Sequence, residues 1–352
     1  MLIAVGETGA WSKSWQSSLL RRGVEPLLVD PVSNDIMHQL RGADALLWHW
    51  DHGDHAAWRV ARGIFAACKE SGILTIPDAG SAQHFDDKVA QKYVLEAIAA
   101  PTIPTWVFVH EEEALDWVAG AEFPKVWKLR RGAGSLAVRM VKDRKEAKAV
   151  VQRAFGRGFR PTASPLADAA TKLRKAPGWS AIAGKTFRIP QTLAAHRLAR
   201  ATEDVERGYV YFQDFISGNT CDIRVTVIGE RAFTFRRTNR PGDFRASGSG
   251  AIQYCSDPAG VDRRAVEIAF QMAGRLQSPS MAFDFLASPT GEPLVVEMSY
   301  AYQADAVAAC PGHFDRNMVW SDGHVRPEDA MVDDLLGALG RDSSCGHSLG
   351  RG

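Results

Sequence analysis

The chain has 352 residues, more than one compact core accommodates, so we expect two or three packed domains. Its formal net charge is +1 at pH 7, which excludes a global electrostatic pull toward nucleic acid or membrane. The sequence shows neither a secretory leader nor a long apolar run, and its five cysteines are scattered without a CxxC pair. These features predict a cytoplasmic protein with reduced thiols that binds neither nucleic acid nor membrane, and they leave homo-oligomerisation open.

The first 84 residues alternate between short apolar strands and helices. Strands are expected at 2–5, 25–29, 45–50 and 73–76, with helices at 13–22, 36–40 and 55–70 between them. This alternation predicts a small parallel sheet, and ligands usually bind where the chain leaves the carboxyl ends of such strands.

The loop after the third strand is rich in histidine. His49, His52 and His55 recur every three residues, with Asp51 and Asp54 between them. One interpretation is a transition-metal site. The other is a polar loop that caps the next helix through Asp54 and contacts substrate.

A second notable feature is the start of the helix expected at 84–99. Asp86 and Asp87 occupy the N-cap region, so Lys88 lies in the first turn. A cation is disfavoured there by the helix dipole, which makes Lys88 useful only if it meets an anion.

The middle of the chain begins with a strand at 105–109, a helix at 111–119, a hairpin at 124–141 and a helix at 142–158. Lys128 places an ammonium group in a mainly apolar strand of this hairpin. Gly132 and Gly134 leave backbone N–H groups free to close over phosphates. The alternative is a mobile hairpin with a lysine that reaches solvent.

Residues 157–207 carry ten basic and four acidic side chains in an otherwise nearly neutral chain. Such a stretch is either a solvated surface or a docking face for an acidic substrate or carrier.

The last part combines strands at 209–216, 222–228 and 231–237 with a helix at 262–276, a hairpin at 281–299 and a helix near 327–339. Arg245 precedes a loop of small residues suited to an oxyanion. Residues 341–352 are rich in Gly and Ser and are expected to fray.

The hairpin at 281–299 places one carboxylate on each arm. Asp284 should share a face with Ala282 and Leu286, because side chains alternate along a strand. Glu297 should share one with Val295 and Ser299. Paired arms would bring the two acids together, and a divalent cation would relieve their repulsion. The alternative is the wet face of an ordinary hairpin.

Taken in order, six motifs resemble the ATP-grasp superfamily from about residue 85 to residue 302. They are Asp87-Lys88, Pro124-x-Val126-x-Lys128, Gln213-Asp214-Phe215-Ile216, Asp222-Ile223-Arg224, Phe244-Arg245, and Asp284 followed by Glu297. The resemblance is nearest to the branch of ribosomal-protein glutamate ligases and to uncharacterised relatives.

The resemblance implies a mixed α/β and α+β protein. A small parallel-sheet domain at 1–84 would precede a two-lobed ATP-grasp fold, with lobes at 85–212 and 213–340, a basic insert at 157–207 and a tail at 341–352. The activity implied is that of an ADP-forming ligase. It would join a small carboxylate substrate, such as an amino acid or a sugar acid, to an amine through an acyl phosphate, using ATP and Mg²⁺, with Mn²⁺ as an alternative ion.

The resemblance also implies site roles. Lys88 and Lys128 would contact phosphates, residues 213–216 would read adenine with help from the Gln213 side chain, and Asp222 would approach the ribose. The full implied nucleotide set is Lys88, Lys128, Ser135, Gln213, Asp214, Phe215, Ile216 and Asp222. The implied metal ligands are Asp284, Glu297 and Ser299, and the implied catalytic residues are Lys128, Arg224 and Arg245.

Three positions depart from the family pattern. Ser299 and Ser247 stand where asparagine is expected, and Asp214 replaces a longer glutamate. Ser299 and Ser247 permit an alternative, a nucleotide-binding module without turnover. A phosphotransferase, which would need no amine, is a second alternative.

Overall fold

The computed structural model describes residues 1–132, 137–160, 205–240, 242–245 and 251–345. Internal contacts divide the chain into two units. Unit 1 comprises Met1–Ile103 and Ile216–Gly352, and unit 2 comprises Pro104–Phe215. The boundary expected after residue 84 does not coincide with a boundary between these units. Residues 85–103 belong to unit 1 because Leu95 lies in its core and the Ile103 N–H donates to the Val295 carbonyl. The three-domain division itself stays a prediction.

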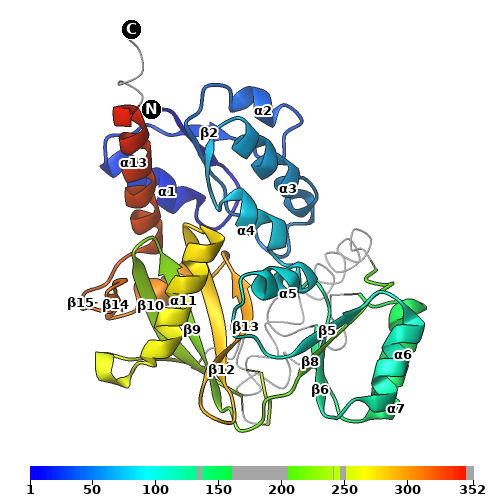
Figure 1. The fold of residues 1–352 in the computed structure, drawn as a ribbon. Coiled ribbons are helices and arrows are strands. Elements are labelled where there is room, and N and C mark those ends of the chain that lie inside the picture. The colour runs from blue at the N-terminus through cyan, green and yellow to red at the C-terminus, as the bar shows by residue number, and fades with distance from the viewer. Residues whose placement is uncertain (133–136, 161–204, 241, 246–250, 346–352) are drawn as a thin grey trace, which may run out of the picture. The chain divides into compact units, whose positions relative to one another are not determined.

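Unit 1 opens with a four-stranded parallel sheet in the order β2-β1-β3-β4 (Figure 1). Its elements are β1 (Ile3–Gly6), α1 (Ser12–Arg21), β2 (Leu27–Val29), α2 (Ile36–Gln39), β3 (Ala45–Leu47), α3 (His55–Glu70) and β4 (Leu74–Ile76). Two helices follow, α4 (Ala79–His84) and α5 (Lys88–Ala97). The prediction of a single helix at 84–99 is therefore wrong at its N-terminal end, because α4 ends at His84 and α5 begins only at Lys88. Asp86 adopts φ 51°, and the chain is extended at Phe85, so the backbone breaks between the two helices.

Aspartates fix the starts of three of these helices. The carboxylates of Asp54, Asp78 and Asp87 each accept a hydrogen bond from a backbone N–H in the first turn of α3, α4 and α5, respectively. Such a cap stabilises a helix by about 1 kcal/mol. The cap expected at Asp54 is confirmed.

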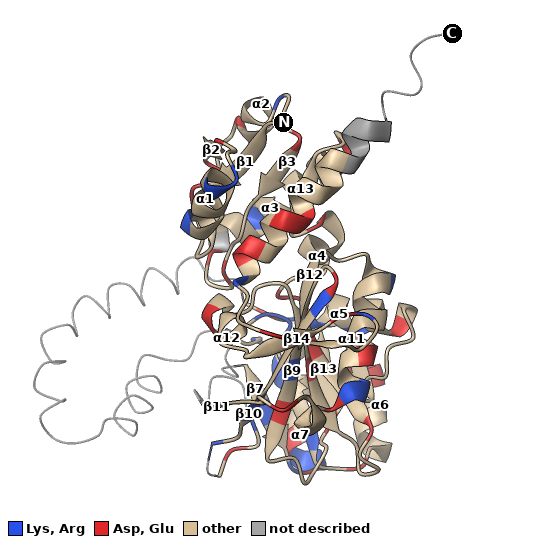
Figure 2. Ribbon diagram, turned by 90° about the vertical axis from the view of Figure 1, so that its left-hand side faces the viewer, with Lys and Arg blue, Asp and Glu red and all other residues tan. Residues whose placement is uncertain are grey.

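The second part of unit 1 is a seven-stranded sheet in the order β13-β12-β9-β10-β14-β15, with β11 paired to β10. Its elements are β9 (Cys221–Ile228), β10 (Arg231–Thr238), β11 (Ile252–Tyr254), the short 3₁₀ helix η2 (Pro258–Gly260), α11 (Arg263–Leu276), β12 (Ser280–Ala287), β13 (Pro293–Ser299), α12 (Ala304–Ala308), β14 (Gly312–Phe314), β15 (Trp320–Asp322) and α13 (Pro327–Cys345). Arginines at the end of α1 and directly after it pair with aspartates of α13; basic and acidic residues appear blue and red in Figure 2. These ion pairs connect the N-terminal and C-terminal segments of unit 1.

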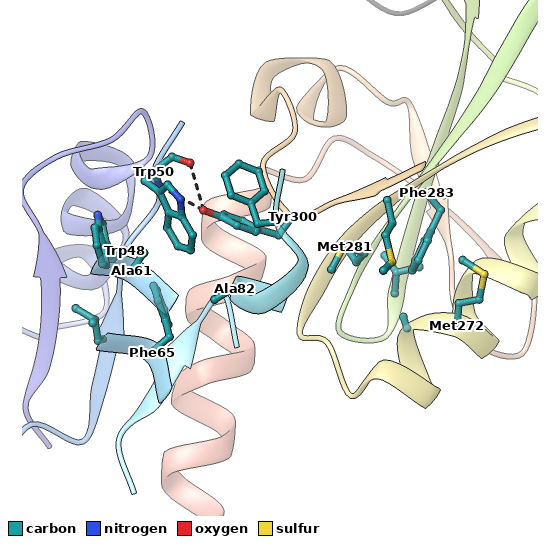
Figure 3. Close-up of a cluster of buried hydrophobic side chains, with 14 of the residues drawn as sticks. Trp48, Trp50, Ala61, Phe65, Ala82, Met272, Met281, Phe283 and Tyr300 are labelled. Atoms are coloured by element: carbon teal, nitrogen blue, oxygen red, sulfur yellow. Dashed lines mark hydrogen bonds between the residues drawn. The ribbon is translucent and has the colours of Figure 1, made fainter. Parts of the chain in front are cut away.

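Alternation along the strands divides the large sheet into two faces. Val225, Phe283 and Phe285 join one core cluster with α11 and the helices of the parallel sheet. Phe233, Phe235 and Ala282 join another with α12 and α13. Figure 3 shows part of the first cluster, which extends from Phe65 and Trp48 to Met281 and Phe283.

Unit 2 is a four-stranded antiparallel sheet in the order β5-β8-β6-β7. Its elements are β5 (Thr105–Phe108), α6 (Glu111–Gly120), β6 (Lys125–Lys128), β7 (Val138–Val141), α7 (Arg144–Phe155) and β8 (Val210–Asp214). Both helices pack on the face that carries Trp127 and Phe212. Together the three sheets confirm the expected mixed α/β and α+β class. Within the described ranges, no helix combines the length and apolar character that crossing a bilayer requires.

Candidate active site

The two acids of the 281–299 hairpin lie directly opposite each other. Strands β12 and β13 pair in antiparallel register, with Asp284 facing Glu297 and Ala282 facing Ser299. Because directly opposed residues in such a pair share a face, both carboxylates lie on the same side of the sheet. The convergence expected from the sequence is confirmed.

One detail of that expectation is wrong. The register shifts after Asp284, so Phe285 faces Val295, and one extra residue of β13 is accommodated at this point. Val295 therefore joins Phe285 in the apolar core and does not share a face with Glu297. A β-bulge of this kind re-aims a side chain, which here lets the strand bury Val295 while Glu297 faces Asp284.

Asp284 is held by two arginines from neighbouring strands. Arg224 Nε and Nη2 donate to its two carboxylate oxygens at 2.7 and 2.8 Å. Arg237 Nη2 lies 2.8 Å from Asp284 Oδ2 and also contacts Asp222 Oδ2 at 2.5 Å. Burial alone would raise the pKa of Asp284, but the guanidinium groups of Arg224 and Arg237 outweigh it and hold this pKa below its ordinary value.

The same contacts act differently on Asp222. Its carboxylate forms a two-point pair with Arg237, through bonds of 2.8 and 2.5 Å. Burial nevertheless raises the pKa of Asp222, and the negative charge of Asp284 adds to that shift. The two aspartates therefore share one arginine between them, and Asp284 is the more firmly ionised.

Lys88 meets the other acid of the hairpin. Its ammonium group lies 3.1 Å from Glu297 Oε1, and the side chain is only 5% exposed. Burial disfavours the charged lysine, but Glu297, Asp86 and Asp87 together raise its pKa above the ordinary value. Lys88, in the first turn of α5, therefore meets an anion, Glu297, which is the condition that the sequence sets for a functional lysine at this position.

Arg245 is oriented by a neighbour. Its guanidinium Nε and Nη2 both donate to the Asp243 carboxylate at 2.8 Å, and the Arg245 backbone N–H donates to the same side chain. This pair fixes Arg245 just before residues 246–250, which lie outside the described ranges together with Ser247.

In unit 2, Lys128 and Gln213 lie on one face of the sheet. Lys128 faces Tyr211 across β6 and β8, and Gln213 is two residues further along β8. Gln213 Nε2 donates to Thr105 Oγ1 at 3.1 Å. Both side chains are buried on the face opposite α6 and α7.

Asp214 is engaged within unit 2. Its carboxylate pairs with the Lys125 ammonium group, which also lies 4.6 Å from the centre of the Trp106 ring. Its backbone N–H donates to the Pro104 carbonyl at 2.9 Å. Phe215 ends unit 2, and Ile216 begins the second segment of unit 1.

The loop at 49–54 leaves the carboxyl edge of the parallel sheet, next to β3. Among the described side chains, no group of three His, Cys, Asp or Glu residues is arranged to hold a metal ion. The His55 side chain lies outside that set, so the transition-metal interpretation of His49, His52 and His55 stays a prediction.

No family model matches the sequence, and no curated protein matches it. Solved structures do match. The chain aligns over 96% of its length with the whole of a RimK-domain ATP-grasp protein from Sphaerobacter thermophilus, at 16% identity and a TM-score of 0.54. The chain has the ATP-grasp fold.

Two further matches support the ATP-grasp fold. D-alanine–D-alanine ligase from Bacillus anthracis, solved with ATP, matches 97% of this chain and 99% of its own at 14% identity and a TM-score of 0.53. The biotin carboxylase domain of 2-oxoglutarate carboxylase from Hydrogenobacter thermophilus, solved with ADP and magnesium, matches 95% of this chain and 69% of its own. Its identity is 14% and its TM-score 0.56.

The chemistry of the two acids, Asp284 and Glu297, fits a magnesium ion. Mg²⁺ is usually held by one or two carboxylates together with phosphate oxygens, and Asp284 and Glu297 supply two opposed carboxylates. Both already contact cations, so phosphate groups must compensate for the added positive charge. Ser299 lies next to them, but its hydroxyl bonds the Ala301 backbone at 3.2 and 3.3 Å, which favours a minor role in metal binding.

Sequence reasoning missed Arg237 and Asp243. Arg237 occupies an ordinary strand position, and only the pairing of β9 with β10 brings it to Asp222. Asp243 precedes Arg245 by two residues, a local signal that would have found it. Ser135 and most of the basic insert, residues 161–204, lie outside the described ranges.

Proposed function

We propose that this protein is an ATP-dependent carboxylate-amine ligase that forms an amide or peptide bond through an acyl phosphate and releases ADP. The observation that carries the proposal is the charged face of unit 1. There, in a chain with the ATP-grasp fold, Asp284 opposes Glu297 while Lys88, Arg224 and Arg237 surround them. Phosphoryl transfer requires mainly positioning and charge neutralisation, and this face offers both.

Lys88 and Arg224 are the cations of unit 1 that we expect to contact phosphate oxygens. Their present partners, Glu297 and Asp284, would hold Mg²⁺, with Ser299 in a minor role. When bound, Mg²⁺ would neutralise charge on the phosphate oxygens. Arg245, oriented by Asp243, would steady the transferred phosphoryl group.

The remaining nucleotide contacts stay proposals carried over from the resemblance. In unit 2, Lys128 would contact phosphate, and Gln213, Asp214 and Phe215 would contribute to the adenine site with Ile216. The Asp214 N–H is already bonded to Pro104, so its carbonyl is the better candidate for adenine. Asp222 is proposed to approach the ribose, for which it must share its carboxylate with Arg237.

The substrates are proposed at the level of class. Similar structures include D-alanine–D-alanine ligase and D-cycloserine synthetase. This likeness favours a small carboxylate, such as an amino acid or sugar acid, and a small amine. A phosphotransferase and a nucleotide-binding module without turnover are the alternatives. The local bonding of Ser299 favours the second of these, because it removes one ligand from the metal.

Two measurements test the proposal. Mg-ATP at about a hundred times its dissociation constant should stabilise the protein by ~2.7 kcal/mol. ADP release should then require both a pooled carboxylate set and a pooled amine set. Release without amine identifies a phosphotransferase, and stabilisation without release identifies a binding module. A wild-type protein that Mg-ATP does not stabilise contradicts the nucleotide assignment altogether.

A further inference from the structure

The histidine-containing loop, residues 49–54, is fixed beside the end of β13. The Tyr300 hydroxyl donates to the Trp50 carbonyl at 3.2 Å, and the Trp50 N–H lies 3.5 Å from the same oxygen (Figure 3). Tyr300 directly follows Ser299, the last residue of the strand that carries Glu297. The loop therefore lies next to the strand on which we place the metal ligands.

Within this region, His52 and Asp86 form a close pair. His52 Nδ1 lies 2.9 Å from Asp86 Oδ1, although the two are not aligned as a hydrogen bond; the Asp86 side chain is 1% exposed and His52 is 27% exposed. The negative charge of Asp86 also helps raise the pKa of Lys88, which pairs with Glu297. His52 therefore lies beside the buried Asp86 carboxylate, whose charge also acts on the Lys88 ammonium that pairs with Glu297.

A second, independent observation indicates that a ligand binds here. His49 is 3% exposed, and neither of its ring nitrogens makes a hydrogen bond to any described residue. Burial lowers its pKa to about 4, so the ring is neutral near pH 7 and can both donate and accept. Its ring centre lies 4.3 Å from that of Trp11, and its nearest carboxylate, Asp51, is 4.0 Å away. A buried imidazole without partners is suited to a polar ligand.

The charge around the loop selects the kind of ligand. Burial raises the pKa of Tyr300, and the negative charges of Asp51, Asp54 and Asp86 raise it further. Asp86 lies 2.9 Å from His52 Nδ1, Asp51 lies 4.0 Å from the neighbouring His49, and the charge of Asp86 also acts on the Lys88 ammonium. Carboxylates favour a positively charged ligand, and the ligase proposed above consumes an amine, which is an ammonium ion in neutral water.

We propose that the loop at 49–54 binds the ammonium form of the amine substrate and that His52 is the general base that activates it. The proposal rests on the ligase function proposed above. Asp86 is a positioning residue: its carboxylate lies beside Nδ1 and favours the tautomer that carries the proton there, which leaves Nε2 to take one proton from the ammonium nitrogen. The freed lone pair forms the bond to the acyl carbon, and the carbon–oxygen bond to phosphate breaks. The second proton of the nitrogen leaves with the departing phosphate, as hydrogen phosphate.

The experiment compares two nucleophiles with the pooled carboxylates and Mg-ATP. Amino acids and amino sugars must lose a proton before they attack, whereas hydroxylamine is largely unprotonated at neutral pH. We expect His52→Gln to slow ADP release with the pooled amines by about 10²–10⁴-fold and to leave release with hydroxylamine within about threefold of wild type. His38→Gln, an exposed histidine of α2, is the matched control and should change neither rate.

The pH profile gives a second readout. The loss of ADP release in His52→Gln with the pooled amines should shrink as the pH rises, because the free amine accumulates and no longer needs a base. Equal loss with both nucleophiles, or no loss with either, overturns the role of His52 while leaving the ligase proposal intact. Absence of ADP release from the wild-type protein overturns both.

A measurement without substrate tests the role of Asp86. Nitrogen-15 spectra of the imidazole rings should show the His52 proton on Nδ1 in the wild-type protein and on Nε2 in Asp86→Asn. A wild-type His52 that carries its proton on Nε2 overturns the proposal, because the nitrogen that must accept the substrate proton is then already protonated.

Discussion

The two faces of strands β9 and β12 have opposite chemistry although they are built from alternate residues of the same strands. On one face Val225, Phe283 and Phe285 are buried against other apolar side chains. On the other, Ala282 packs in an apolar cluster, but Arg224 and Asp284 lie largely buried and form an ion pair. The apolar face gains stability from removing surface from water, whereas the charged face gains little net stability and keeps its ions in place for a ligand.

The largest expected effect comes from the charged face. Asp284→Ala leaves the guanidinium groups of Arg224 and Arg237 without their shared partner. We expect a loss of about 3–5 kcal/mol in unfolding free energy and a fall of about 10²–10³ in turnover. Denaturant unfolding and ADP release measure the two. Arg236→Met, on the other face of β10, is the control and should change stability by less than ~0.5 kcal/mol. Unchanged ADP release in Asp284→Ala would contradict the assignment of the site.

The apolar face should respond in stability alone. Phe283→Ala leaves a cavity beside Met281 and should cost about 3–5 kcal/mol of unfolding free energy. The additional stability that Mg-ATP provides should stay within experimental error of the wild-type value. If this substitution abolishes nucleotide stabilisation at a temperature where the protein is still folded, the two faces are not functionally separate.

A smaller effect is expected at the edge of the charged face. Lys88→Met removes the cation next to Glu297, whose side chain is 33% exposed and can turn to water, so the loss of stability should be small. The stabilisation by Mg-ATP should fall by about 1.5–3 kcal/mol, the contribution of hydrogen bonds to a charged group. Thermal unfolding with and without Mg-ATP measures both, and equal nucleotide stabilisation in variant and wild type would contradict the phosphate role.

The comparison extends to His84, a buried group with no ion pair to any described residue. Burial lowers the pKa of His84 from 6.5 to about 4, even though the charges of Asp78 and Asp87 oppose that shift. The unfolded chain therefore binds more protons between pH 6.5 and pH 4, and stability falls as the pH falls through this window. His84→Gln should reduce the dependence of unfolding free energy on pH in this window. Part of the dependence should remain, because burial also lowers the pKa of His49 to about 4. Unfolding free energies at pH 7, 5.5 and 4.5 test it, and an unchanged slope would count against a buried neutral His84.

Much of the fold followed from local signals. Apolar periodicity, turn residues and aspartate caps predicted α3 at 55–70 with its observed bounds, and they predicted most other helices and strands to within a few residues. Four short elements, β11, α12, β14 and β15, were not predicted. β2, β3 and β4 are equally short, but their alternation with helices made them recognisable.

The sequence by itself determined which residues carry charge in apolar strands, where the helices begin, and the order of the motifs that resemble an ATP-grasp protein. Only the tertiary structure decided that Glu297 opposes Asp284 across a bulge that sends Val295 into the core, and that Arg237 joins Asp222 to Asp284. Register and bulges depend on how distant segments pair. A strand read alone shows which side chains alternate, but its partner decides which of them meet.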